Sequence, residues 1–143
     1  MASYTVDTVI DAPRDVVYGI FADRENNGKF LPIKTRLKSE GKTERQGEGA
    51  VHFLGLGPVG VSEQITKLVP GERIEYKIVA GAPVKSHTGT ILFSDSGKGT
   101  RVVYTMDSTP KLPVPEAVLK AGLKQLIGTF VNGVKREAAR QPR

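Results

Sequence analysis

The strongest pattern along the chain is a helical repeat near its C-terminal end. Over residues 115–140, apolar residues recur at steps of three and four, and the stripe consists of Leu119, Leu123, Leu126, Ile127, Phe130 and Val134. At about 100° per residue these positions fall within an arc of roughly 100°. Pro115 and Glu116 suit the first turn of a helix. The pattern predicts a long amphipathic helix that needs a large apolar surface to lie on.

The segment before this helix alternates between apolar and polar positions, as strands with one buried face do. The pattern predicts a first strand over residues 3–11. After Pro13 it predicts a short helix, and then a second helical turn or loop. From residue 33 the chain is predicted to be extended. Gly- and Pro-containing turns separate the further strands, which are predicted over residues 50–54, 59–69, 73–80, 85–94 and 100–107.

This order of elements predicts an α+β fold formed by one domain, residues 1–143. Strands with one apolar face, followed by one amphipathic helix, indicate a curved antiparallel sheet covered by that helix. A straight helix on a strongly curved sheet leaves a space between the two, which is the first indication of function.

Composition excludes several classes of protein. The chain has no cysteine, so it has no disulfide or thiolate metal site, and two separated histidines without a carboxylate cluster do not indicate a metal site. The N-terminal residues lack the pattern of a signal peptide, and no window is apolar enough to span a membrane. We therefore expect a cytoplasmic protein, monomeric or homodimeric, with no metal or cofactor.

The net charge of +6 is concentrated in residues 115–143, which carry +4 of it. A basic outer helix face can contact an anionic membrane or a ribosome, although a solvated polar face explains the same charges. Aromatic residues are not interleaved with the basic ones, so a stacking platform for nucleic acid is not indicated.

Several short segments resemble the START-related helix-grip superfamily (SRPBCC), in particular its polyketide cyclase/dehydrase-like branch. They are Ile-Asp-Ala-Pro at 10–13, Glu-Gln-Ile at 63–65, Pro-Gly-Glu-Arg-Ile-Glu-Tyr at 70–76, Gly-Thr-Arg-Val at 99–102, and the terminal helix. The resemblance implies a seven-stranded antiparallel sheet wrapped around the C-terminal helix, with two short helices between strands 1 and 2. It also implies a cavity for an apolar or amphipathic small molecule, but it does not imply a reaction.

Two ionisable residues share a strand face with core residues. Glu63 alternates with Val61 and Ile65, and His87 alternates with Gly89 and Ile91. An unpaired carboxylate on such a face costs several kcal/mol, so Glu63 must be paired, meet a ligand or pocket water, or reach solvent at a strand end. In plant abscisic-acid receptors of the superfamily an inward glutamate follows a Gly-Leu-Pro gate hairpin, and residues 55–58 are similar to that gate.

We expect a small number of polar groups to converge in a mainly apolar pocket. Glu63 and His87 are also candidates for acid–base chemistry, although a hydrogen-bonded core histidine is the commoner arrangement. His52 is expected to be exposed. The expected ligand-binding residues are Phe30, Phe53, Glu63, Tyr76, His87, Ile91, Tyr104, Met106, Leu123, Ile127 and Phe130, of which Leu123, Ile127 and Phe130 belong to the helix.

Three functions are consistent with these observations. The favoured interpretation is a non-catalytic binder or carrier of a hydrophobic small molecule, such as a lipid, a polyketide or an isoprenoid. The alternative is a polyketide cyclase or dehydratase that uses His87 and Glu63. The second alternative is a regulatory protein that associates with a ribosome or membrane through its basic helix.

Overall fold

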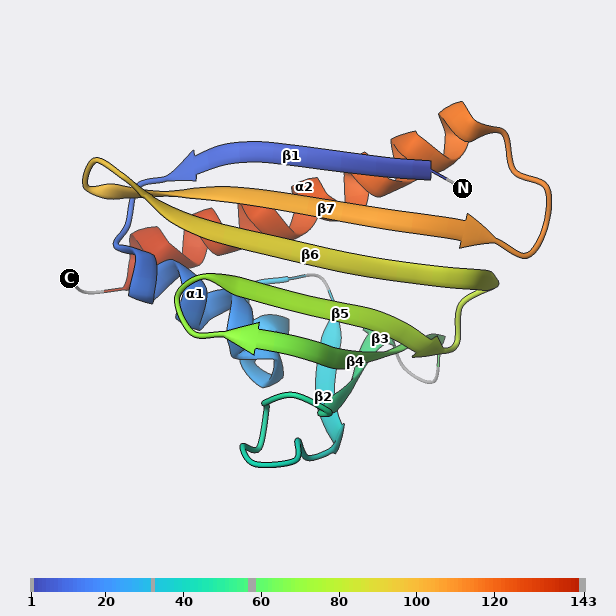
Figure 1. The fold of residues 1–143 in the computed structure, drawn as a ribbon, viewed down its shortest axis with the longest axis horizontal. Helices are drawn as coiled ribbons and strands as arrows, with labels where there is room; N and C mark the ends of the chain where they lie inside the picture. Colours follow the sequence, from blue (N-terminus) through green and yellow to red (C-terminus); the bar gives the residue numbers. More distant parts are fainter. Residues whose placement is uncertain (1, 32, 57–58, 142–143) are drawn as a thin grey trace.

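A computed structural model describes residues 2–31, 33–56 and 59–141 of the chain (Figure 1). Its elements, in chain order, are β1 (Ala2–Ile10), α1 (Arg14–Ala22), the 3-10 helix η1 (Arg24–Lys29), β2 (Lys34–Ser39), β3 (Val51–Leu56), β4 (Val59–Val69), β5 (Arg73–Ala80), β6 (Val84–Ser96), β7 (Gly99–Pro110) and α2 (Glu116–Arg140). The predicted order of strands and helices is confirmed.

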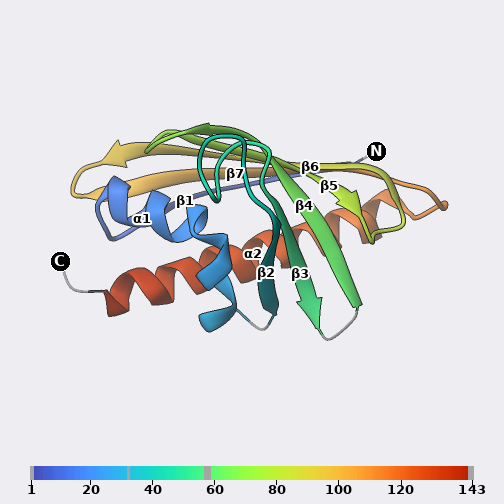
Figure 2. The ribbon, with the colours of Figure 1, turned by 90° about the horizontal axis from the view of Figure 1, so that it is seen from below.

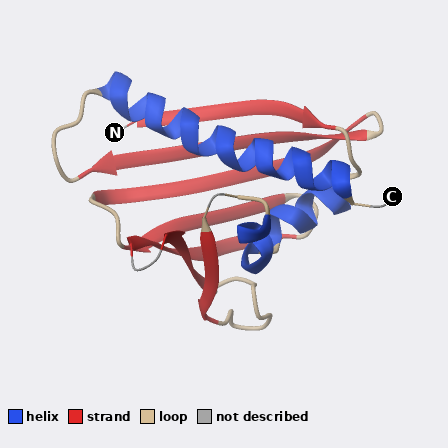
Figure 3. Ribbon diagram, turned by 180° about the vertical axis from the view of Figure 1, so that it is seen from behind, coloured by secondary structure: helices blue, strands red, loops and turns tan. Residues whose placement is uncertain are grey.

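All neighbouring strands of the seven-stranded sheet are antiparallel, and the strand order is β1-β7-β6-β5-β4-β3-β2. The sheet curves over one side of α2, with β2, β3 and β4 bent round towards the helix (Figure 2). Seen from the helix side, α2 crosses the sheet obliquely, and α1 lies beside its C-terminal half (Figure 3). The predicted helix-grip architecture is confirmed. No helix among the described residues is both long and apolar enough to cross a membrane.

The C-terminal half of α2 carries most of its buried face. Leu123, Ile127, Val131, Val134 and Ala138 are buried at steps of three and four, as expected for a helix lying on a surface. The predicted stripe was wrong at Leu126, which is 49% exposed. The reason is tertiary: the N-terminal half of α2 crosses the sheet where none of the described short helices fills the space beneath it.

Aromatic side chains close the end of the molecule near α1. The Phe21 ring of α1 meets the Phe93 ring edge-on at 5.6 Å between centroids and the Tyr104 ring at 6.1 Å. Edge-to-face contacts of this kind add to the stabilisation from burial alone. The space between sheet and helix is therefore filled by packed side chains at this end.

The predicted faces of β4, β5, β6 and β7 agree with the observed burial, but the prediction for β3 was wrong. His52 is fully buried, and Phe53 lies on the opposite face, half-buried, with the Arg36 guanidinium 5.1 Å from its ring centroid. The register explains this result, because His52 is paired with Glu63 and Phe53 with Ser62. Directly opposed residues of antiparallel strands share a face, so an inward Glu63 brings His52 inward.

A glycine on β6 makes room for a tyrosine on β5. Gly89 is paired with Tyr76, and a Cβ at Gly89 would lie 2.2 Å from the Tyr76 ring.

We therefore predict that Gly89→Ala lowers the free energy of unfolding by about 1–3 kcal/mol, the usual cost of overpacking a core. Urea unfolding provides the measurement. Gly122→Ala is the control, because a Cβ at Gly122 meets no atom within 4 Å and alanine adds up to about 1 kcal/mol of helix propensity. Equal stability of Gly89→Ala and the wild type would contradict the prediction.

Candidate ligand-binding site

A cavity of about 650 Å³ lies between the sheet and the N-terminal half of α2. Its apolar residues on the sheet side include Leu54, Val61, Ile78, Ala82, Val84 and Met106. Its residues on the helix side include Val118, Leu119, Gly122, Leu123, Leu126 and Phe130. The volume and the predominance of apolar side chains are typical of small-molecule sites.

The cavity reaches the surface beside the start of α2. Val114, Val118 and Leu126 line it, although they are 39%, 61% and 49% exposed to solvent. Large apolar side chains in such positions form the rim of an entrance rather than part of a sealed core.

Four polar residues also line the cavity: Glu63, His87, Ser108 and Gln125. His87 and Ser108 are directly paired across β6 and β7, and Glu63 is paired with Ile78 across β4 and β5. Burial lowers the pKa of His87, so its imidazole is neutral near pH 7. The described lining includes neither lysine nor arginine.

Glu63 forms a buried ion pair with Arg24, the first residue of η1. The Arg24 side chain is only 1% exposed, and its guanidinium carbon lies 4.8 Å from the Tyr76 ring centroid and 5.9 Å from that of Phe130. Burial opposes the charge, but the Glu63 carboxylate together with the nearby phenols of Tyr104 and Tyr76 outweighs this effect and raises the pKa of Arg24. Glu63 was expected to be paired, to meet a ligand or pocket water, or to reach solvent, and in the structure it is paired with Arg24.

Two tyrosines complete this buried cluster. The Tyr76 and Tyr104 hydroxyls are hydrogen-bonded to each other at 2.5 Å. Burial raises the pKa of both phenols above their ordinary value. Both hydroxyls therefore stay protonated near pH 7.

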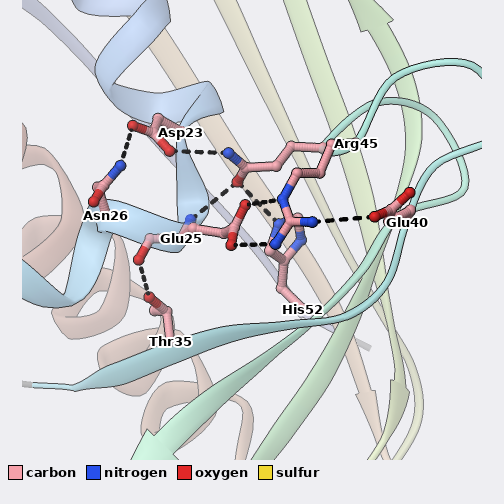
Figure 4. A network of polar contacts seen from close by, with 8 residues as sticks. Asp23, Glu25, Asn26, Thr35, Glu40, Arg45 and His52 are labelled. Carbon is pink, nitrogen blue, oxygen red and sulfur yellow. Dashed lines mark hydrogen bonds and ion pairs between the residues drawn. The ribbon is translucent and has the colours of Figure 1, made fainter.

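His52 belongs to a second polar network, which fastens the loop between β2 and β3 to η1 (Figure 4). Its Nε2 donates to Gln46 Oε1 at 3.1 Å, and the same oxygen accepts the Glu25 backbone N–H at 3.0 Å. Gln46 Nε2 donates to Asp23 at 2.9 Å, and Arg45 is paired with Glu25. Burial and then the Arg24 charge lower the pKa of His52 to about 4, so His52 is neutral and structural near pH 7.

The structure separates the expected site residues into two groups. Glu63, His87, Met106, Leu123 and Phe130 line the cavity. The other six are placed elsewhere: the solid core contains Tyr76, Ile91, Tyr104 and Ile127, the outer sheet face carries Phe53, and the region beside Gly133 contains Phe30.

The burial of Arg24 was not predicted. Arg24 follows the apolar positions of α1 directly, where a charged residue usually marks a helix end in solvent, so the pattern gave no signal of burial. The possible gate at residues 55–58 depends on residues 57 and 58, which lie outside the described residues. Within the described residues, no group of three His, Asp or Glu side chains is placed to hold a metal ion.

The sequence profile of the family described as "Polyketide cyclase / dehydrase and lipid transport" matches residues 1–139. The chain belongs to this family. It is similar in structure to a START superfamily protein from Mycobacterium smegmatis, with a TM-score of 0.84 and 13% identity over 96% of this chain and 97% of that chain. The family match confirms the expected superfamily.

Two further solved structures share the fold. Ara h 8.0201 has a TM-score of 0.77 at 13% identity, covering 97% of this chain and 98% of that one. TTHA0849 from Thermus thermophilus has a TM-score of 0.74 at 19% identity, covering 96% of this chain and 97% of that one. Identities this low establish the fold alone. No curated protein sequence matches this chain.

The ion pair gives a prediction about stability. Arg24→Met leaves Glu63 as a lone buried charge and should lower the free energy of unfolding by about 3–5 kcal/mol. The double variant Arg24→Met/Glu63→Gln has no charge left to bury, so it should recover at least half of that loss. Urea unfolding of the wild type, the single variant and the double variant provides the test. A double variant no more stable than Arg24→Met would contradict it.

The environment of His52 gives a prediction about pH. The unfolded chain binds a proton at His52 below its ordinary pKa of 6.5, whereas the folded protein resists protonation down to about pH 4. Stability present at pH 7 is therefore lost as the pH falls through this window, by on the order of 2 kcal/mol. We expect His52→Gln to show a shallower fall in unfolding free energy between pH 6.5 and 4.5. An unchanged slope would show that His52 does not cause the loss.

Proposed function

We propose that this protein binds a hydrophobic or amphipathic small molecule in the cavity between α2 and the sheet. The observation that carries the proposal is the cavity itself: about 650 Å³, lined mainly by apolar side chains. Each 100 Å² of apolar ligand surface removed from water there contributes about 2.5 kcal/mol to binding.

The form of the entrance supports a ligand that enters from outside. Val118 and Leu126 belong both to the cavity lining and to the exposed surface. Gly122 lies between them on the same side of α2, and a Cβ at this position would meet open space. This part of the helix therefore covers the cavity without filling it.

The family description includes both lipid transport and cyclase or dehydrase activity, so a cyclase-type enzyme is the second candidate. One observation favours it: Glu63 and His87 line the same cavity. We rank binding first because Arg24 already holds the Glu63 carboxylate, and no hydrogen bond among the described residues joins Glu63 to His87.

A substitution that fills the entrance tests the proposal. Gly122→Phe should project a ring into the cavity and weaken binding of the neutral fluorescent probe N-phenyl-1-naphthylamine at least about tenfold, since the ring takes the volume that the probe needs. The measurement is probe fluorescence titrated with protein.

Gly128→Phe is the matched control. It lies on the same helix, a Cβ there also meets no atom within 4 Å, and Gly128 does not line the cavity. Both variants exchange glycine for the same residue, so their effects on helix propensity are alike. Probe binding should persist in Gly128→Phe. Equal binding by both variants, or no binding by the wild type, would refute the proposed site.

A further inference from the structure

The polar residues of the cavity form a row across the sheet. Glu63 on β4 is paired with Ile78 on β5, and His87 on β6 is paired with Ser108 on β7. Between these pairs, β5 and β6 are joined at Lys77 and Thr88, the residues next to Ile78 and His87. Neighbouring strands lie about 4.8 Å apart. The row therefore crosses the cavity floor with the acidic Glu63 at one end and the neutral Ser108 at the other. The rest of the described floor is apolar.

The carboxylate at one end of this row can only accept hydrogen bonds. Glu63 Oε1 bonds to Arg24, and among the described residues no protein donor reaches Glu63 Oε2. Glu63 lines the cavity, and 8% of its side chain remains accessible. An acceptor that faces the cavity in this way is satisfied by water or by an N–H or O–H donor from whatever occupies the cavity.

The positive charge of Arg24 is not available to a ligand. Arg24 is absent from the described cavity lining, whereas its two neighbours Glu63 and Phe130 belong to it. The remaining described lining contains no lysine or arginine. An anionic head group would therefore meet the Glu63 carboxylate with no cation to balance it, which is costly in a desolvated site.

We propose that the cavity selects a neutral apolar molecule that carries a hydroxyl or N–H donor, such as an alcohol or a phenol, and excludes molecules with a free carboxylate or phosphate. The donor binds Glu63, and a second polar group on the ligand can bind His87 or Ser108, each of which can donate or accept. This inference rests on the proposed function, because it names the ligand class of the same cavity.

The test compares three probes that share a decyl chain. 1-Decanol carries a donor, decyl methyl ether carries only an acceptor, and decanoate carries a negative charge at pH 7.5. Each displaces N-phenyl-1-naphthylamine from the wild-type protein, and the displacement curves give relative affinities. We expect decanol to bind most tightly and decanoate at least about tenfold more weakly than decanol. Decanoate or the ether binding as tightly as decanol would overturn the inference.

The double variant Arg24→Met/Glu63→Gln provides an independent arm. Without the carboxylate, the affinity for decanoate should rise to within about threefold of that for decanol. An undiminished preference for decanol in the folded double variant would overturn the assignment to Glu63. Three probes that bind equally well, all blocked by Gly122→Phe, would refute only the ligand class. Failure of every probe to bind the wild type would refute the proposed function as well.

Discussion

The buried pair of Arg24 and Glu63 connects the parts of this structure that lie far apart in the sequence. Arg24 begins η1, Glu63 lies in the middle of β4, and the guanidinium contacts the rings of Tyr76 on β5 and Phe130 on α2. A buried charge is tolerated only where its partner is held in place. The pair thus requires the short helices, the sheet and the long helix to assemble together, and it leaves a carboxylate facing the cavity.

The space between the sheet and α2 has two parts, one filled by packed side chains and one left as a cavity. At one end, α1 inserts Phe21 against Phe93 and Tyr104, and the C-terminal half of α2 packs tightly. At the other end none of the described short helices is present, and the N-terminal half of α2 faces a cavity. The ion pair lies between these regions: Arg24 is buried on the core side, and Glu63 and Phe130 line the cavity.

The lining of the candidate cavity could be predicted only in part. The alternation of residues along the strands was sufficient to place Glu63, His87 and Met106 on the face that lines the cavity, because a period of two decides which face of the sheet a side chain takes. It was not sufficient for Ile91, Tyr76 and Tyr104, which share that face but lie in the solid core. There Phe21 of α1 packs against Tyr104, and Arg24 of η1 lies over Tyr76. Phe53 and His52 exchanged their expected faces because the pairing of β3 with β4, rather than local hydrophobicity, fixed the orientation of β3.

The sequence by itself determined the number and order of the elements, the superfamily and the long amphipathic helix, because these follow from periodicity and from turn residues close together in the chain. Only the tertiary structure decided which part of the helix is buried, which residue neutralises Glu63 and where the cavity opens. Arg24 and Glu63 are 39 residues apart, and no local pattern encodes a contact across such a distance. Burial and pairing of charge depend on the complete assembly of the sheet and its helices.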